Sequence, residues 1–274
     1  TTADTSIAAG EFLTLQTRFE GQDLQQLKKG TASAEQVTVS FYVKGNAAAL
    51  YVCELHDVDN GRNNTQSFAV TTDWNRIELT FAADTSDPLD DDTAVSLSLN
   101  FWLHSGSNYS GGTFASNTWA DITLANTTAV ADRTSIYDST DRTFFLTGVQ
   151  MEVGSTATDF ESRSFGEELA LCERYFQLVP QVGLAYAGAT TTVDTCVPYR
   201  TPMRAAPTIT AIAAITVTNV TAADFAQSSA NITGSISVGA SSAHLRLGNF
   251  SSLTTSDMYL CRNGDMNVAA AAEL

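Results

Sequence analysis

The sequence predicts a mainly β protein with three parts: an antiparallel jelly-roll β-sandwich over residues 1–163, a short connecting α-helix over 164–179, and a second, smaller β-sandwich over 180–274. Apolar and polar residues alternate along many short segments, which is typical of half-buried strands. Turn-forming Asn, Gly, Asp and Ser separate these segments, as they do in antiparallel sandwiches. One segment between the two strand-rich blocks instead carries the start and stop signals of a helix.

The first block repeats the strand pattern several times. In "QVTVSFYVKG", Val37, Val39 and Phe41 alternate with polar neighbours, and "LTLQTRF", "RIELTFAA" and "VSLSLNFWLH" follow the same rule. Each of these strands therefore has one face for the core. The segment "GQDLQQL" has room for only a helical turn, and Gly148 interrupts a later strand as a bulge glycine does.

The helix signals lie after residue 163. Ser164 and Glu167 have the spacing of a capping box, and Pro180 prevents continuation. Between Ser164 and Pro180, four apolar residues share one helical face: Phe165, Leu169, Cys172 and Phe176. This face either closes the end of its own sandwich or packs against copies of itself about a symmetry axis.

The second block contains short strand-like segments of small residues, including "TITAIAAITVTNV", "ANITGSISVGA", "AHLRLGNF" and "DMYLCRNG". Pro198, Pro202 and Pro207 mark an extended stretch or an edge before them. A domain of about 95 residues with so many small side chains has a thin core. We therefore expect contacts between subunits to supply part of its burial.

Charge and cysteine content exclude several classes of partner. The chain has 30 acidic and 14 basic residues, a formal net charge of -16, which disfavours binding to nucleic acid or to anionic membranes. No apolar run approaches the roughly 20 residues of a membrane span, so membrane insertion is not expected. The four cysteines, Cys53, Cys172, Cys196 and Cys261, form no CxxC pair and are predicted to be buried thiols.

The polar side of one strand is the candidate binding face. Trp102 and His104 fall on that side together with Asn100, so an aromatic ring lies among amides and hydroxyls. Sugars are recognised in this way, by stacking of their CH surface and by hydrogen bonds to their hydroxyls. Further candidates are Tyr42, Tyr109 and Trp119. The alternative is that a loop or a neighbouring subunit covers Trp102.

Catalytic and metal-binding signals are weak. The sequence has no GxSxG, HExxH or P-loop motif, so we expect a protein that is not an enzyme, with a glycan-degrading enzyme as the alternative. The acidic segment "DTSDPLDDD" offers oxygen ligands for a structural calcium ion at Asp87, Asp90, Asp91 and Asp92. The alternative is that this acidic segment is a solvated hairpin loop without a calcium ion. No other cofactor is expected.

One long segment resembles a known family. "FFLTGVQMEVGSTATDFESRSFGEELALCERYFQ" is similar to the recurring signature of bacteriophage virion appendage proteins of the tail-fibre and receptor-binding type. Further matches are "AAGEFLTLQTRFEGQDLQQLKKGTASAEQVTVSFYVKG", "TTDWNRIELTFAADT" and the closing "AAAAEL". The resemblance spans most of the chain and is weaker over 181–274. Relatives typically carry further sandwich strands upstream of the position of Thr1.

The resemblance implies a function and a location. It implies a carbohydrate-binding-module-like jelly roll that attaches to a host-surface glycan. It also implies assembly as a homotrimer, contacts with other virion proteins, and a place in the virion after assembly in the host bacterial cytoplasm. The alternative within the same class is a capsid decoration or head fibre protein that acts through protein–protein contacts.

Overall fold

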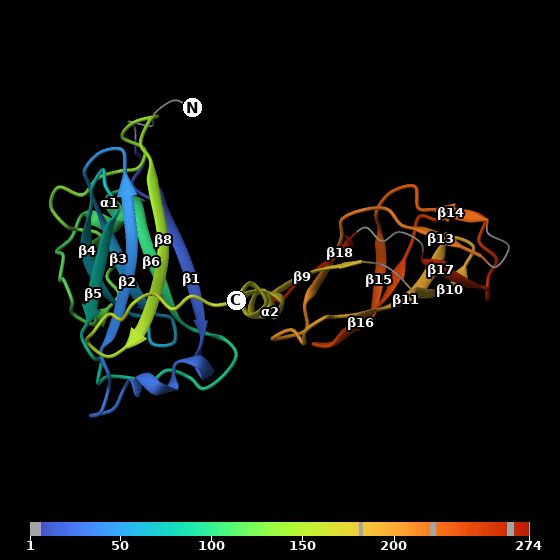
Figure 1. Ribbon diagram of the computed structural model, residues 1–274, viewed down its shortest axis with the longest axis horizontal. Helices are drawn as coiled ribbons and strands as arrows, with labels where there is room; N and C mark the ends of the chain where they lie inside the picture. The colour runs from blue at the N-terminus through green and yellow to red at the C-terminus, as the bar shows by residue number, and fades with distance from the viewer. Residues whose placement is uncertain (1–6, 181–182, 220–222, 262–265, 274) are drawn as a thin grey trace. The chain divides into compact units, whose positions relative to one another are not determined.

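The structure is a computed structural model that describes residues 7–180, 183–219, 223–261 and 266–273. The chain divides into two compact units, Thr1–Ser162 (unit 1) and Arg163–Glu273 (unit 2), one residue before the predicted boundary. Both consist mainly of antiparallel strands (Figure 1). The mainly β class is therefore confirmed, while the jelly-roll connectivity stays a prediction.

Unit 1 is formed by two sheets. The five-stranded sheet has the order β1-β6-β3-β4-β7, and the three-stranded sheet has the order β5-β2-β8. The strands are β1 (Phe12–Glu20), β2 (Val37–Gly45), β3 (Ala49–Asp57), β4 (Arg62–Val70), β5 (Asn75–Phe81), β6 (Val95–Ser105), β7 (Ala120–Asp121) and β8 (Phe144–Val153). The short helical segments are η1 (Gly21–Asp23), η2 (Gln25–Leu27), α1 (Ser107–Ser110) and η3 (Leu124–Asn126).

The core of unit 1 lies between its two sheets. Phe41 of β2 is fully buried, and its ring centroid lies 5.0 Å from those of Phe68 on β4 and Phe101 on β6. The alternating residues of β2 and β6 face this core as predicted. Gly148 has φ of 59° at a register shift between β2 and β8, which confirms the predicted bulge.

Unit 2 has a seven-stranded sheet, β14-β13-β17-β10-β11-β16-β15, and a three-stranded sheet, β12-β18-β9. Its elements are α2 (Phe165–Glu173), β9 (Phe176–Pro180), β10 (Gly183–Ala189), β11 (Thr192–Pro198), β12 (Thr208–Ala211), β13 (Thr216–Thr218), β14 (Asp224–Ala226), β15 (Ile232–Val238), β16 (Ser242–Leu247), β17 (Met258–Cys261) and β18 (Met266–Ala271). Small residues such as Ala185, Ala187 and Ala243 form part of the core, as the sequence predicts.

The helix α2 is shorter than predicted. Ser164 and Glu167 do form the capping box, but the helix ends at Glu173, and residues 176–180 are strand β9, paired with β18. Phe176 therefore does not belong to the helix. Phe165 is 82% exposed and Leu169 is 41% exposed, so the predicted apolar face is not buried within unit 2. Among the described residues, no helix is long and apolar enough to cross a membrane.

The prediction for the cysteines is half wrong. Cys53 and Cys261 are buried in the cores of units 1 and 2, whereas Cys172 and Cys196 are exposed. Burial raises the pKa of the Cys261 thiol to about 11, and it also raises the pKa of the Cys53 thiol. Cys172 is exposed because it lies on a face of α2 that is not covered within unit 2, and Cys196 is exposed because it lies on the outer side of β11.

Candidate functional site

The outer face of the five-stranded sheet carries an ordered set of polar side chains. Antiparallel register places Gln16 of β1 opposite Asn100 of β6, and Asn100 opposite Glu54 of β3. In the next row that points to the same side of the sheet, Trp102 of β6 lies between Thr14 of β1 and Val52 of β3. Since alternate residues of β3 and β6 face the core, these side chains all point to the other side of the sheet.

Glu54 is the centre of this face. Its carboxylate is almost completely buried, with the residue 3% exposed, and it accepts three hydrogen bonds. Asn100 Nδ2 and Trp102 Nε1 donate to Oε2 over 2.9 and 2.7 Å, and Asn63 Nδ2 donates to Oε1 over 2.7 Å. These donors offset the cost of removing a carboxylate from water, and they fix the orientation of the Trp102 indole.

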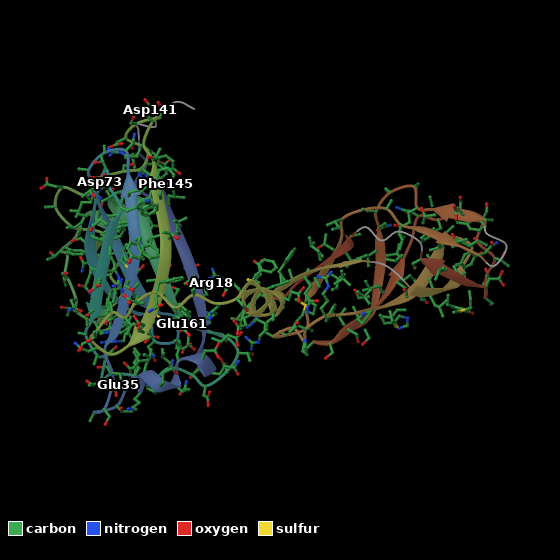
Figure 2. The ribbon with its side chains drawn as sticks, viewed as in Figure 1. Arg18, Glu35, Asp73, Asp141, Phe145 and Glu161 are labelled. Atoms are coloured by element: carbon green, nitrogen blue, oxygen red, sulfur yellow. The ribbon has the colours of Figure 1, made fainter. Side chains whose placement is uncertain are left out.

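The hydrogen-bond network continues to the sheet edge. Gln16 Nε2 donates to Asn100 Oδ1 over 2.8 Å, and Arg18 Nε donates to Gln16 Oε1 over 2.8 Å. Arg18 projects from β1 (Figure 2) and both Gln16 and Arg18 are exposed. The row therefore runs from a buried anion to solvent-exposed amide groups that can donate and accept hydrogen bonds.

Three aromatic rings lie beside the polar row. The Trp102 ring lies 5.7 Å from Phe12 and 5.2 Å from Tyr109, and Phe12 lies 5.2 Å from Tyr109, measured between centroids. The short helix α1 supplies Tyr109, and the first residue of β1 supplies Phe12. Phe12 is 53% exposed, while Trp102 and Tyr109 are half-buried. The cluster presents apolar surface at the rim of the polar face.

A groove of about 200 Å³ runs between this face and the segment after α1. It is lined by Phe12, Thr14, Gln16, Glu54, His56, Asn100, Trp102, Ile122, Leu124 and Thr127. Its volume is below the roughly 300–1,000 Å³ typical of pockets for drug-sized ligands. The groove thus suits a short part of a larger ligand, held by hydrogen bonds on one side and by ring surface on the other.

His104 lies on the predicted face but is covered. It is buried, its Nδ1 lies 2.7 Å from Ser135 Oγ, and its ring packs edge-on against Tyr137 at 5.0 Å. The segment that contains Ser135 and Tyr137 therefore separates His104 from solvent. His104 is a packed side chain of the sheet and does not line the groove.

Two other predicted aromatics lie elsewhere in unit 1. Tyr42 is on β2 of the three-stranded sheet, where its ring packs near the Arg76 guanidinium at 6.0 Å. Trp119 is half-buried against the core, and its Nε1 donates to the Ala82 carbonyl over 2.7 Å. Which sheet a strand joins depends on pairing between distant segments, so the alternating pattern alone could not assign these rings to a face.

The acidic segment does not form a metal cluster. Asp87, Asp90, Asp91 and Asp92 are all exposed. Within the described ranges, no three His, Cys, Asp or Glu side chains gather in a group that could hold a metal ion. The solvated loop agrees with this exposure, and a structural calcium ion stays an untested expectation.

A lysine supplies the positive charge beneath this acidic loop. Lys29 Nζ lies 2.5 Å from Asp57 Oδ2 and 3.1 Å from Asp84 Oδ2, and all three side chains are buried. Lys29 also donates to the carbonyls of Ser86 and Asp87 over 3.1 and 2.8 Å. The ammonium group is thus surrounded by two carboxylate oxygens and two backbone carbonyl oxygens. Oxygen atoms of these kinds are also the ligands that calcium prefers, but here the lysine supplies the positive charge.

Sequence reasoning missed Glu54 and Phe12. Glu54 interrupts the apolar strand β3, "ALYVCELHD", and a carboxylate in such a strand is a signal of a hydrogen-bonded or functional site. Its donors come from β4 and β6, which only the folded sheet brings together. Phe12 carried no such signal, because an apolar residue at the start of a strand is ordinary.

Comparison with known proteins adds no assignment. No protein-family model matches the chain, and no curated protein matches it. The function therefore has to be inferred from the groove and the chemistry of the residues around it.

Proposed function

We propose that the protein is a bacteriophage virion component of the tail-fibre or receptor-binding class, and that the groove of unit 1 attaches to a neutral host-surface glycan. In this proposal the chain assembles with copies of itself as a homotrimer and with other virion proteins. Assembly takes place in the host bacterial cytoplasm, and the mature location is the virion. The sequence resemblance supports the class of protein, and the groove supports the ligand.

The observation that carries the proposal is the combination of rings and amides on one sheet face. Trp102, Phe12 and Tyr109 form a contiguous aromatic cluster beside Gln16 and Asn100. A sugar ring has an apolar CH face and a hydroxyl-rich edge, so it matches such a surface on both counts. The groove opens to solvent at Phe12 and Gln16, which gives a chain-like ligand access.

Charge favours a neutral glycan over an acidic one. Glu54 is the acidic residue among those lining the groove, and its carboxylate already orients the Asn100 amide and the Trp102 indole. A sugar carboxylate or sulfate in the groove would meet this negative charge at short range. The formal net charge of -16 adds a repulsion at longer range.

The same groove favours binding over cleavage. Glycoside hydrolysis generally requires two carboxyl groups that flank the scissile bond. Glu54 is the one carboxylate among the described residues that line the groove, and three hydrogen bonds hold it in a fixed position. The proposed role is therefore attachment without catalysis.

A capsid decoration or head fibre protein is the second candidate. The half-burial of Trp102 favours it, because contacts with Phe12 and Tyr109 are also what a structural aromatic residue makes. In that case the cluster would support protein–protein contacts in the particle, and no glycan would bind.

Host-cell and glycan-array binding by the full chain distinguishes these candidates. Trp102→Ala should lower affinity by about 5- to 150-fold, which corresponds to a loss of about 1–3 kcal/mol for a stacked anchor. Phe12→Ala should also weaken binding with less effect on folding, because Phe12 is already 53% exposed. Trp74→Ala is the matched control, since Trp74 is exposed, does not line the groove and contacts Lys44.

Melting temperature provides the folding control for each variant. If Trp102→Ala and Phe12→Ala bind as well as Trp74→Ala, the groove is not the glycan site. The decoration-protein candidate would then be favoured. The same conclusion would follow if binding fell only in proportion to lost stability.

A further inference from the structure

The outer face of the seven-stranded sheet in unit 2 carries an exposed apolar patch. Strands β10 and β17 are neighbours (Figure 1), and their register pairs Leu184 with Leu260 and Tyr186 with Met258. The exposed fractions of Leu184, Tyr186, Met258 and Leu260 are 65%, 43%, 49% and 50%. Alternate residues of the same strands, including Ala185 and Tyr259, are buried in the core. We call these four exposed residues the unit 2 patch.

The patch has the size of an interface centre. Its exposed fractions correspond to roughly 400 Å², within the range of about 300–600 Å² of the largest patch on a typical monomer, which is often functional. A stable complex buries about 800 Å² on each partner, with an apolar centre and a polar rim. The ion pair of Asp194 with Arg246, joined by two hydrogen bonds of 2.7 Å, lies on the neighbouring strands β11 and β16 and can serve as that rim.

The lack of charge on the patch and the small core residues of β10 are compatible with another copy as the partner that covers it. Two copies of a chain with a formal net charge of -16 repel each other, so they associate best across a surface without charge, and the unit 2 patch contains none. Beneath it, β10 contributes only the small Ala185 and Ala187 to the core, while β17 contributes the large ring of Tyr259. Burial of the patch against another copy would add apolar contact on the side where the unit lacks it.

We propose that the unit 2 patch is the surface through which copies of this chain associate. This inference rests on the self-association that the proposed function includes, and it is independent of the glycan groove, which lies on unit 1. Its test needs no ligand, so its failure and the failure of glycan attachment can be told apart.

An exposed thiol gives a natural reporter at this surface. Ala185 of β10 pairs with Thr195 of β11, and both side chains face the core. Because the strands are antiparallel, the next residue of β11, Cys196, lies beside Leu184 of β10, and both point to the outer side of the sheet. Cys196 is exposed in the single chain, as is Cys172 on α2. Association through the unit 2 patch would protect Cys196 from alkylation, whereas Cys172 lies outside the patch.

The test combines molar mass and alkylation on the full chain. Light scattering at micromolar concentration should give a multiple of the 29.2 kDa chain mass. Leu260→Glu should shift the mass to that of the monomer, because it places a charge at the centre of the interface. Val58→Glu, at an exposed position of unit 1, should leave the oligomer intact. Peptide mass spectrometry should show slow alkylation of Cys196 in the wild type and fast alkylation in Leu260→Glu.

Each other outcome overturns the proposal. A wild-type chain that is monomeric would mean that no copy covers the patch. An oligomer that survives Leu260→Glu, with Cys196 alkylated as fast as Cys172 in both proteins, would mean that copies associate elsewhere. If Leu260→Glu perturbs the fold, the wild-type protein still decides the matter, since dilution to monomer must raise the alkylation rate of Cys196.

Discussion

Units 1 and 2 are both antiparallel β structures, but their cores are built from side chains of different size. Unit 1 closes two sheets over large rings such as Phe41, Phe68 and Phe101, and it also encloses the Lys29 ion cluster. Alanine and valine make up about half of the buried core of unit 2. Both units leave some large apolar side chains exposed, such as Phe12 in unit 1 and Leu184 in unit 2. On the proposals above, unit 1 presents the groove, and unit 2 gains part of its stability from contacts with other copies.

The largest expected effect is the loss of the buried cation in unit 1. Lys29→Met would leave Asp57, which is fully buried, without its positive partner. Breaking a buried ion pair in this way typically costs about 3–5 kcal/mol of unfolding free energy. Urea unfolding followed by tryptophan fluorescence measures unit 1 alone, because Trp74, Trp102 and Trp119 all lie there.

The adjacent lysine is the control. Lys28 pairs with Glu35 at an exposed position, so Lys28→Met should change the unfolding free energy of unit 1 by less than about 1 kcal/mol. Equal and small effects of the two substitutions would show that the cluster does not stabilise unit 1, and would weaken the contrast between the units.

A smaller effect is expected from the carboxylate of the groove. The carboxylate of Glu54 accepts three hydrogen bonds on its two oxygens. In Glu54→Gln one of these oxygens becomes an NH₂ group, which cannot accept a hydrogen bond, so at least one donor loses its acceptor. The expected loss is about 1.5–3 kcal/mol, the range for hydrogen bonds to a charged group. The emission of Trp102 should shift as well, since its indole loses an ionised partner. Glu35→Gln, at an exposed site, should change neither quantity, and equal behaviour of the two variants would contradict the positioning role of Glu54.

The smallest expected effect is that of Asp84 on the stability of unit 1, and it appears only at acidic pH. Burial alone would raise the pKa of Asp84, but the Ser86 N–H, Arg62 and Lys29 outweigh it and hold this pKa below its usual value. Asp84 therefore stabilises unit 1 above the unfolded-state pKa of about 3.9, and this contribution is lost as pH falls through the lower folded-state value. Tryptophan-detected stability should fall on acidification, and Asp84→Asn should make that fall less steep. An unchanged acid slope in the variant would exclude Asp84 as a cause.

Much of the fold could be predicted from local sequence. The alternation in β2 and β6, the bulge at Gly148 and the capping box of α2 depend on neighbouring residues, and all are present. The end of α2 could not be predicted, because Phe176 belongs to a strand that pairs with β18, about 90 positions away. A helical spacing of apolar residues does not exclude such long-range pairing.

The candidate site was predictable only in part. The polar side of β6 identified Trp102 and Asn100, both of which line the groove. His104 shares that side but is covered by Ser135 and Tyr137, which follow β6 by about 30 positions. Glu54 required knowledge of which strands flank β3. The sequence thus indicated one strand of the site, and the sheet order determined the rest.

The most direct test of the difference between the units uses their two buried thiols. Cys53 lies in the core of unit 1 and Cys261 in the core of unit 2, so alkylation during urea unfolding reports each unit separately. We expect the midpoint for Cys261 to rise with protein concentration, because association stabilises unit 2 by mass action, and the midpoint for Cys53 to stay constant. Midpoints that are both independent of concentration would contradict the dependence of unit 2 on other copies.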